Sequence, residues 1–180
     1  MKTSYIFKLL SSLDDNERSR VLSFWAAGTE CEEHMITETP ASLQENLLEG
    51  FIAYTENGDL VGCAGIFPAR TKYSVKIIFA SKDVVELGSN YIEPAHRNRG
   101  LGKQLLIQRI AYCRQRNYFI VSVTLNPAMQ HIFCSSSAGA HSMDNQPEYY
   151  QQLKQDLCVC REVSDACRSC PLQKNGGWVF

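Results

Sequence analysis

A short glycine-containing turn, Arg97–Gly102, constrains the fold of this chain more than any other feature of its sequence. It follows an apolar run typical of a strand, Val84–Ile92, and precedes a run typical of a helix, which begins at Lys103. The two glycines of the turn lack a Cβ atom, so a ligand can approach the backbone closely. The free amides at the start of a helix favour negative charge, and the basic side chains around the turn would reinforce this preference. The turn therefore predicts an anion site, with a diphosphate as the expected ligand.

The spacing of this turn, R-x-x-G-x-G after a strand, resembles the coenzyme A-binding motif of GNAT N-acetyltransferases. The resemblance extends from Val84 to Asn126: Glu93-Pro94 ends the strand, a long amphipathic helix follows, and a second apolar strand leads to Asn126. A dinucleotide-binding G-x-G-x-x-G fingerprint is an alternative, but no third glycine follows Gly102 at the required place. A glycine turn without any ligand is the other alternative.

The resemblance implies acetyl-CoA as co-substrate, with its diphosphate at the turn. In that family the pantetheine lies along the preceding strand, where a backbone amide polarises the thioester carbonyl. Asn126 matches a position whose side chain contacts the coenzyme, although Asn126-Pro127 is also a good helix N-cap followed by proline. The implied coenzyme-binding residues are Asn90, Tyr91, Ile92, Arg97, Asn98, Arg99, Gly100, Leu101, Gly102, Lys103 and Asn126.

Acyl transfer to an amine requires a base, because the free amine is mostly protonated at neutral pH. Glu86 lies 11 residues before Arg97, which is the spacing of the base glutamate in the histone-acetylating branch of the family. Strand alternation also places Glu86 on the face that carries Asn90. A solvated strand carboxylate is the alternative. A second family pattern, with a glutamate five residues before the asparagine, is absent because Val121 stands there.

The chain departs from the family at Phe133, seven residues after Asn126, where the family carries a proton-donating tyrosine. Phenylalanine cannot protonate the leaving thiolate. His131 is nearby in sequence, but helix geometry turns it away from residue 133, and we interpret it as a surface or packing histidine. The predicted function is N-acetyl transfer to a primary amine of a small molecule or peptide. The alternatives are a non-catalytic acyl-CoA-binding sensor or interaction protein with a zinc-stapled tail, and an enzyme with a longer acyl donor.

A cysteine cluster near the end of the chain is the second informative motif. C-x-C followed by C-x-x-C offers four thiolates to one tetrahedral ion, and zinc is the first choice. A disulfide, redox-active thiols, an iron–sulfur cluster or no ligand are the alternatives. We expect a single GNAT domain over residues 1–180, with 154–180 as a Cys-rich segment and Gly176–Phe180 as a last strand. The candidate zinc ligands are Cys158, Cys160, Cys167 and Cys170.

The remaining cysteines are expected to be inert. Cys63 and Cys113 lie in apolar segments and are predicted to be packed thiols. Cys31 lies in an acidic loop, whose carboxylates could face a cationic substrate or only the solvent.

Composition limits the partners of the chain. With 180 residues, 44% of them hydrophobic, it can bury one full core without staples. A net charge of −1 argues against a nucleic-acid partner, and no apolar run approaches the length of a membrane span. The first ten residues resemble a strand more than a signal peptide. We therefore expect a cytoplasmic protein without nucleic-acid or membrane partners; its oligomeric state is left open, a dimer included.

The expected fold class is α/β, specifically the GNAT acyl-CoA N-acyltransferase fold. It has a mixed, mostly antiparallel twisted sheet, flanked by helices and splayed at its fourth and fifth strands. Local patterns predict the other elements. The first elements are a strand over Tyr5–Leu10, a helix capped by Asp14 or Asp15, with Val21, Leu22, Phe24 and Trp25 inward and Gly28 as its stop, and a helix that begins at Thr39-Pro40 with Leu43, Leu47 and Leu48 on its apolar face. A hairpin of Phe51–Thr55 and Leu60–Phe67 around Glu56–Asp59 follows, and then a strand or loop over Val75–Ala80. The last elements are a helix that buries Leu105, Leu106, Ile110 and Cys113 while Lys103, Arg109, Arg114 and Arg116 face outward, and a strand over Phe119–Leu125.

Overall fold

A computed structural model of the chain describes residues 4–32, 35, 37–68, 84–124, 126–135, 140–142 and 177–180. The chain divides into two compact units, the first formed by 1–66 and 88–109 and the second by 67–87 and 110–180. Among the described residues, no helix has the length and apolar character needed to cross a membrane. The predicted strand Val75–Ala80 and the four candidate zinc ligands lie outside these residues.

The first unit is built on an antiparallel meander. Strand β1 (Tyr5–Leu9) pairs with β2 (Glu49–Thr55), and β2 pairs with β3 (Leu60–Pro68). The predicted hairpin turn joins β2 to β3, and its Gly58 has a φ of 88°, which glycine adopts without strain. Strand β4 (Val84–Ile92) follows β3 in the sheet order, with its part from Gly88 onward in this unit. The predicted strand Tyr5–Leu10 is confirmed, except that Leu10 already belongs to a 3₁₀ turn, Leu10–Ser12.

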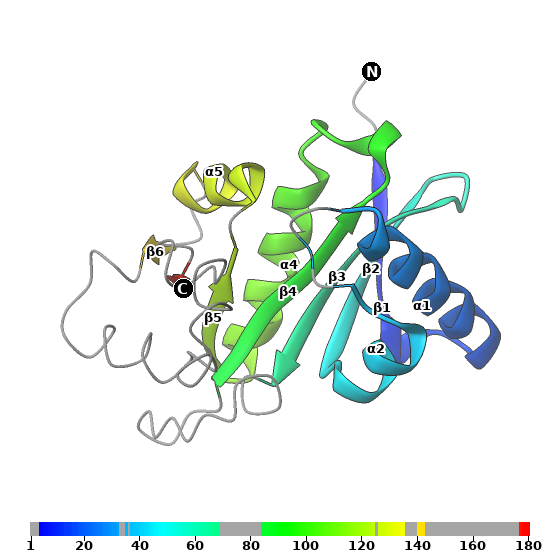
Figure 1. Ribbon diagram of the computed structural model, residues 1–180, viewed down its shortest axis with the longest axis horizontal. Coiled ribbons are helices and arrows are strands. Elements are labelled where there is room, and N and C mark those ends of the chain that lie inside the picture. Colours follow the sequence, from blue (N-terminus) through cyan, green and yellow to red (C-terminus); the bar gives the residue numbers. More distant parts are fainter. Residues whose placement is uncertain are drawn as a thin grey trace, which may run out of the picture. The chain divides into compact units, whose positions relative to one another are not determined.

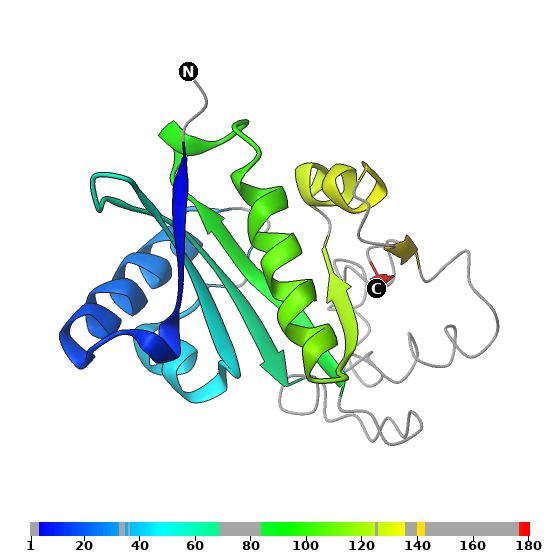
Figure 2. The same ribbon diagram turned by 180° about the vertical axis from the view of Figure 1, so that it is seen from behind.

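Two capped helices cover one face of this meander, and the first part of a third helix covers the other (Figures 1 and 2). Helix α1 (Asp15–Glu30) begins at Asp14, whose carboxylate accepts a hydrogen bond from the Glu17 amide at 2.9 Å. Helix α2 (Pro40–Asn46) begins at Thr39, which forms a capping box with Ser42. Both starts were predicted from sequence. The predicted stripe of α2 is only partly right, because the helix ends before Leu47 and Leu48, and Leu48 is exposed.

The predicted helix stop at Gly28 is wrong. Helix α1 continues to Glu30, and Gly28 is a buried residue inside it. A Cβ atom at residue 28 would lie 2.5 Å from Cγ of Tyr91, a residue of β4. Glycine is therefore required here because the Tyr91 ring of β4 approaches the helix closely. It does not terminate the helix.

Helix α4 (Leu101–Gln115) starts within the glycine turn, two residues before the predicted start at Lys103, and contributes residues to both units. Its predicted inner face is confirmed, because the four apolar residues expected there are buried. Arg109 was expected to face outward, and this is wrong: the residue is 1% exposed. Its guanidinium donates hydrogen bonds to the carbonyls of Gly65 at 3.1 Å, Gly88 at 3.4 Å and Leu105 at 3.3 Å. Carbonyls of β3 and β4 therefore contribute to the compensation of this buried cation.

The second unit contains the first half of β4 and the later elements of the chain. Strand β5 (Phe119–Val123) pairs in parallel with β4 over Val84–Glu86. Strand β7 (Gly177–Val179) lies between β5 and β6 (His141–Ser142) and is antiparallel to both, so the predicted last strand is confirmed. Helix α5 (Pro127–Ser135) follows β5. These strands and helices are the elements that the expected fold class requires.

Candidate functional site

A short segment joins the end of β4 to the glycine turn. The Glu93 amide donates a hydrogen bond to the carbonyl of Val61 at 3.0 Å, which ties the end of β4 to β3. A 3₁₀ turn, Pro94–His96, follows and is closed by a hydrogen bond from the His96 amide to the Glu93 carbonyl at 2.8 Å. The segment that leads into the turn is therefore held at both ends by backbone hydrogen bonds.

Two residues of the turn have left-handed backbone conformations. Asn98 has a φ of 59° and Gly100 a φ of 79°. The first hydrogen bond of α4 runs from the Gln104 amide to the Gly100 carbonyl at 3.1 Å. In the part of the chain that the structure describes, the amides of residues 100–103 have no hydrogen-bond acceptor. Free amides at a helix start, next to left-handed residues, form a concave group of donors that suits an anion.

Arg97 makes two contacts that the sequence did not predict. Its Nε donates a hydrogen bond to the carbonyl of Ile92 at 2.9 Å, and its guanidinium forms an ion pair with Glu32. The side chain thus links the turn to the segment after α1. Glu32 belongs to the acidic loop, and this carboxylate is paired and not merely solvated. Arg99 and Lys103, by contrast, are exposed.

Strand β4 contains a residue with a left-handed backbone conformation, Ser89, which has a φ of 46°. The Ser89 carbonyl accepts a hydrogen bond from Nε1 of Trp25 at 2.8 Å, and its hydroxyl donates one to Glu38 at 3.3 Å. Strict alternation of faces does not continue across a left-handed residue. The sequence argument that placed Glu86 and Asn90 on one face therefore loses its basis, because Ser89 lies between them.

The predicted base, Glu86, is 2% exposed, so its interpretation as a solvated strand carboxylate is wrong. It lies in the second unit, on the part of β4 that pairs with β5. The predicted pantetheine-binding residues Asn90, Tyr91 and Ile92 lie in the first unit and are partly exposed. Burial raises the pKa of the Tyr91 hydroxyl, which keeps it neutral at physiological pH.

The structure assigns capping to Asn126. Its Oδ1 accepts hydrogen bonds from the amides of Ala128 at 2.9 Å and Met129 at 3.4 Å, at the start of α5. Phe133, which replaces the family tyrosine, is 2% exposed. Its ring packs edge-on against Trp178 and Phe180, with centroid distances of 5.5 and 5.0 Å. Phe133 therefore belongs to the core of the second unit, while the neighbouring His131 is a surface histidine, as interpreted from the sequence.

Cys63 and Cys113 are buried, as predicted, and burial raises the pKa of the Cys63 thiol. Cys31 is exposed. Within the described ranges, no cluster of three or more His, Cys, Asp or Glu side chains could hold a metal ion. The Cys158–Cys170 cluster lies outside these ranges.

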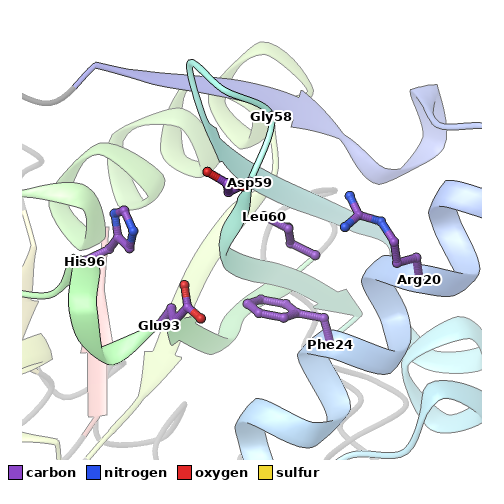
Figure 3. A pocket seen from close by; sticks show the side chains of 7 residues that line it. All are labelled: Arg20, Phe24, Gly58, Asp59, Leu60, Glu93 and His96. Carbon is purple, nitrogen blue, oxygen red and sulfur yellow. The ribbon is translucent and has the colours of Figure 1, made fainter.

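One cavity of the first unit was not anticipated from the sequence. It has a volume of about 610 Å³ and lies where α1, the β2–β3 turn and the end of β4 meet (Figure 3). No spacing pattern could have indicated it, because the lining residues come from three separate segments. They are Arg20, Phe24, Gly58, Asp59, Leu60, Glu93 and His96.

Comparison with known proteins identifies a family. Residues 16–134, more than half of the chain, match the model of the acetyltransferase (GNAT) family. Comparison with functionally curated proteins gave no match.

Several solved structures share the fold. The GNAT family N-acetyltransferase YhbS from Escherichia coli, in complex with CoA, aligns with a TM-score of 0.53 and 15% identity, covering 79% of this chain and 71% of its own. N-acetylglutamate synthase from Neisseria gonorrhoeae, complexed with coenzyme A and N-acetyl-glutamate, gives 0.54 and 17%, covering 83% of this chain and 32% of its own. The putative acetyltransferase yncA from Salmonella typhimurium, with acetyl-CoA, gives 0.53 and 18%, covering 74% and 78%. The predicted acyl-CoA N-acyltransferase fold is confirmed.

Proposed function

The chain belongs to the acetyltransferase (GNAT) family, and from this premise we propose that it transfers the acetyl group of acetyl-CoA to a primary amine of a small molecule or peptide. The free amides of residues 100–103, at the start of α4, are the observation that carries this proposal. A diphosphate needs several converging N–H donors, and these amides supply them at the positive end of the α4 dipole. Exposed Arg99 and Lys103 add positive charge beside them.

The other coenzyme contacts follow the family pattern. We propose that the pantetheine pairs with the backbone of Asn90, Tyr91 and Ile92, with one of these amides stabilising the oxyanion. In this proposal Arg97 acts as the residue that holds the turn against β4 and Glu32. Asn126 would contact the coenzyme in addition to capping α5. The proposed cradle is Arg97, Asn98, Arg99, Gly100, Leu101, Gly102 and Lys103.

Glu86 is the proposed base. In the transfer step, the amine nitrogen forms a bond to the thioester carbon while Glu86 accepts a proton from that nitrogen. The tetrahedral intermediate then breaks its C–S bond, and the thiolate leaves. A thiol is acidic enough to leave without a dedicated proton donor, so the buried Phe133 does not prevent the step.

The test measures thiol release from acetyl-CoA with a panel of primary amines, alongside coenzyme affinity by calorimetry. We expect turnover, and we expect Glu86→Gln to lower it by about 100-fold or more with unchanged CoA affinity, because only base catalysis is removed. Glu45→Gln, an exposed change on α2, is the control. An unchanged rate in Glu86→Gln would exclude Glu86 from the mechanism.

A second candidate function is a non-catalytic acyl-CoA sensor. Phe133 favours it, because a buried phenylalanine stands where the family places its acid. In that case the protein would bind CoA but release no thiol with any amine. An enzyme specific for a longer acyl donor would instead turn over only when acetyl-CoA is replaced by longer acyl-CoA substrates.

We also propose that Cys158, Cys160, Cys167 and Cys170 form a structural zinc site in a cytoplasmic protein. Reducing conditions would keep these thiols available as ligands. Metal analysis of the purified protein should find zinc bound to the chain, and a variant with serine at all four positions should lose it. Retention of zinc by that variant would contradict the assignment.

A further inference from the structure

The cavity of the first unit lies outside the proposed transfer chemistry, and we propose that it binds an organic ammonium compound. The cationic groups of the ligand would face Asp59 and Glu93, and its apolar stem would lie against Phe24 and Leu60. In Figure 3 the two carboxyl groups point into the cavity from opposite edges, Asp59 from the β2–β3 turn and Glu93 from the end of β4. Arg20 lies across from them, on α1.

The charge of Arg20 is already compensated. Its Nε and one terminal nitrogen donate hydrogen bonds to the two carboxylate oxygens of Glu17, at 2.8 and 2.6 Å. The Tyr54 hydroxyl donates a further hydrogen bond to the same carboxylate at 2.7 Å. These contacts lower the pKa of Glu17 to about 2, so Glu17 is ionised at physiological pH and forms a neutral pair with Arg20.

The two carboxylates of the cavity have no such compensation. Asp59 accepts a hydrogen bond from the Thr55 hydroxyl at 3.0 Å, which is a neutral donor. Among the described residues, neither Asp59 nor Glu93 forms an ion pair with a lysine or arginine. Since Arg20 is paired with Glu17, the cavity wall carries more negative than positive charge, which disfavours an anionic ligand and favours a cationic one.

The remaining wall suits the stem of such a ligand. Leu60 is buried, and Phe24 is half-buried and packs edge-on against Tyr91 at a centroid distance of 5.4 Å. An aromatic ring beside carboxylates attracts alkylammonium groups through its face as well as through apolar contact. A volume of about 610 Å³ is within the usual range for small-molecule sites. His96 closes one side, with Nδ1 3.3 Å from the Tyr5 hydroxyl.

The experiment titrates the full-length protein with 1,5-diaminopentane by calorimetry, in the absence of acetyl-CoA. No transfer can occur without acetyl-CoA. Because the diamine is itself a primary amine, the cavity variants, and not binding alone, distinguish this cavity from an acceptor site. Pentane-1,5-diol, which has the same stem without charge, and inorganic phosphate are the comparison ligands. We expect binding of the diamine alone.

The variants assign the binding to the cavity. Glu93→Gln should weaken binding by about tenfold, because a half-buried charge partner is removed. Asp59→Asn should weaken it by about threefold, since Asp59 is exposed and asparagine still accepts the bond from Thr55. Glu56→Gln, on the same turn but outside the cavity, is the matched control and should bind like wild type. No binding of the diamine, equal binding of the diol, or undiminished binding by both cavity variants would overturn the proposal.

Discussion

Gly28 occupies a position in α1 where most residues would strengthen the helix, yet the ring of Tyr91 fills the space of its missing Cβ. A glycine-to-alanine change inside a helix normally stabilises by about 1 kcal/mol. Here the added methyl group would lie 2.5 Å from Cγ of Tyr91, and the ring is held between α1 and β4. We therefore expect Gly28→Ala to lower the free energy of unfolding by about 1–3 kcal/mol, measured by denaturant titration.

A variant at the neighbouring position measures the effect of helix propensity on stability separately from that of packing. Ala27 is exposed on α1, so Ala27→Gly should cost only the propensity difference of about 1 kcal/mol. If Gly28→Ala instead stabilises the protein by a similar amount, the close contact with Tyr91 is not what requires glycine.

Gly100 is constrained by its backbone and not by its surroundings. Its φ is 79°, and a Cβ atom there would have no heavy atom within 4 Å. Alanine would meet no clash but would pay about 1–2 kcal/mol for the left-handed conformation. If the turn binds the coenzyme diphosphate, its backbone amides should be displaced in the Gly100→Ala variant. CoA affinity measured by calorimetry should then fall by about tenfold.

Gly58 provides the matched control, because its φ of 88° is also left-handed and a Cβ atom there would have no heavy atom within 4 Å. Gly58→Ala introduces the same backbone strain in the β2–β3 turn, outside the cradle, so CoA affinity should stay close to wild type. Equal affinities for Gly100→Ala and wild type would show that the conformation of the turn does not determine binding.

Arg109 connects three elements through hydrogen bonds to carbonyls of β3, β4 and α4. Arg109→Met keeps much of the side-chain volume but removes every donor, leaving buried carbonyls without these partners. We expect the free energy of unfolding to fall by about 2–4 kcal/mol. Arg114→Met, exposed on the same helix, should change it by less than about 0.5 kcal/mol. A fully stable Arg109→Met variant would exclude this role.

These elements also show which features the sequence could predict. The caps at Asp14 and Thr39 and the hairpin turn depend on local residues, and all are confirmed. The predicted start of α4, Lys103, is two residues late, because the helix begins at Leu101. The location of the glycine turn, between a strand and a helix, also depends on residues that are close in sequence. The burial of Arg109 is not local, because the carbonyls of Gly65 and Gly88 come from distant segments.

The same distinction applies at the candidate site. The position of the proposed anion cradle follows from the spacing of its glycines and stays a prediction. The pairing of Arg97 with Glu32 was not predictable from the sequence. The left-handed conformation of Ser89 in β4 was not predictable either, and this residue contacts Trp25 and Glu38 from distant segments. The amine cavity combines three separate segments, and no motif joins them.

At the scale of the whole molecule, β4 and α4 each contribute residues to both compact units. The core of the second unit depends on the end of the described chain. Trp178, 8% exposed, lies on β7 and packs against Phe133, while the Phe180 amide donates a hydrogen bond to the carbonyl of Ile120 at 3.2 Å. Loss of this strand should therefore loosen β5 first.

Trp178→Ala tests whether the two units open separately. We expect the free energy of opening of the β5 amides, measured by native-state hydrogen exchange, to fall by about 3–5 kcal/mol, because a large buried side chain is removed. The β1–β2 amides, which pair within the first unit, should keep their protection. Trp25→Ala, which removes a buried tryptophan of the first unit, should reverse the pattern. If either variant lowers the protection of both units equally, the elements that the two units share make the chain open as one cooperative unit.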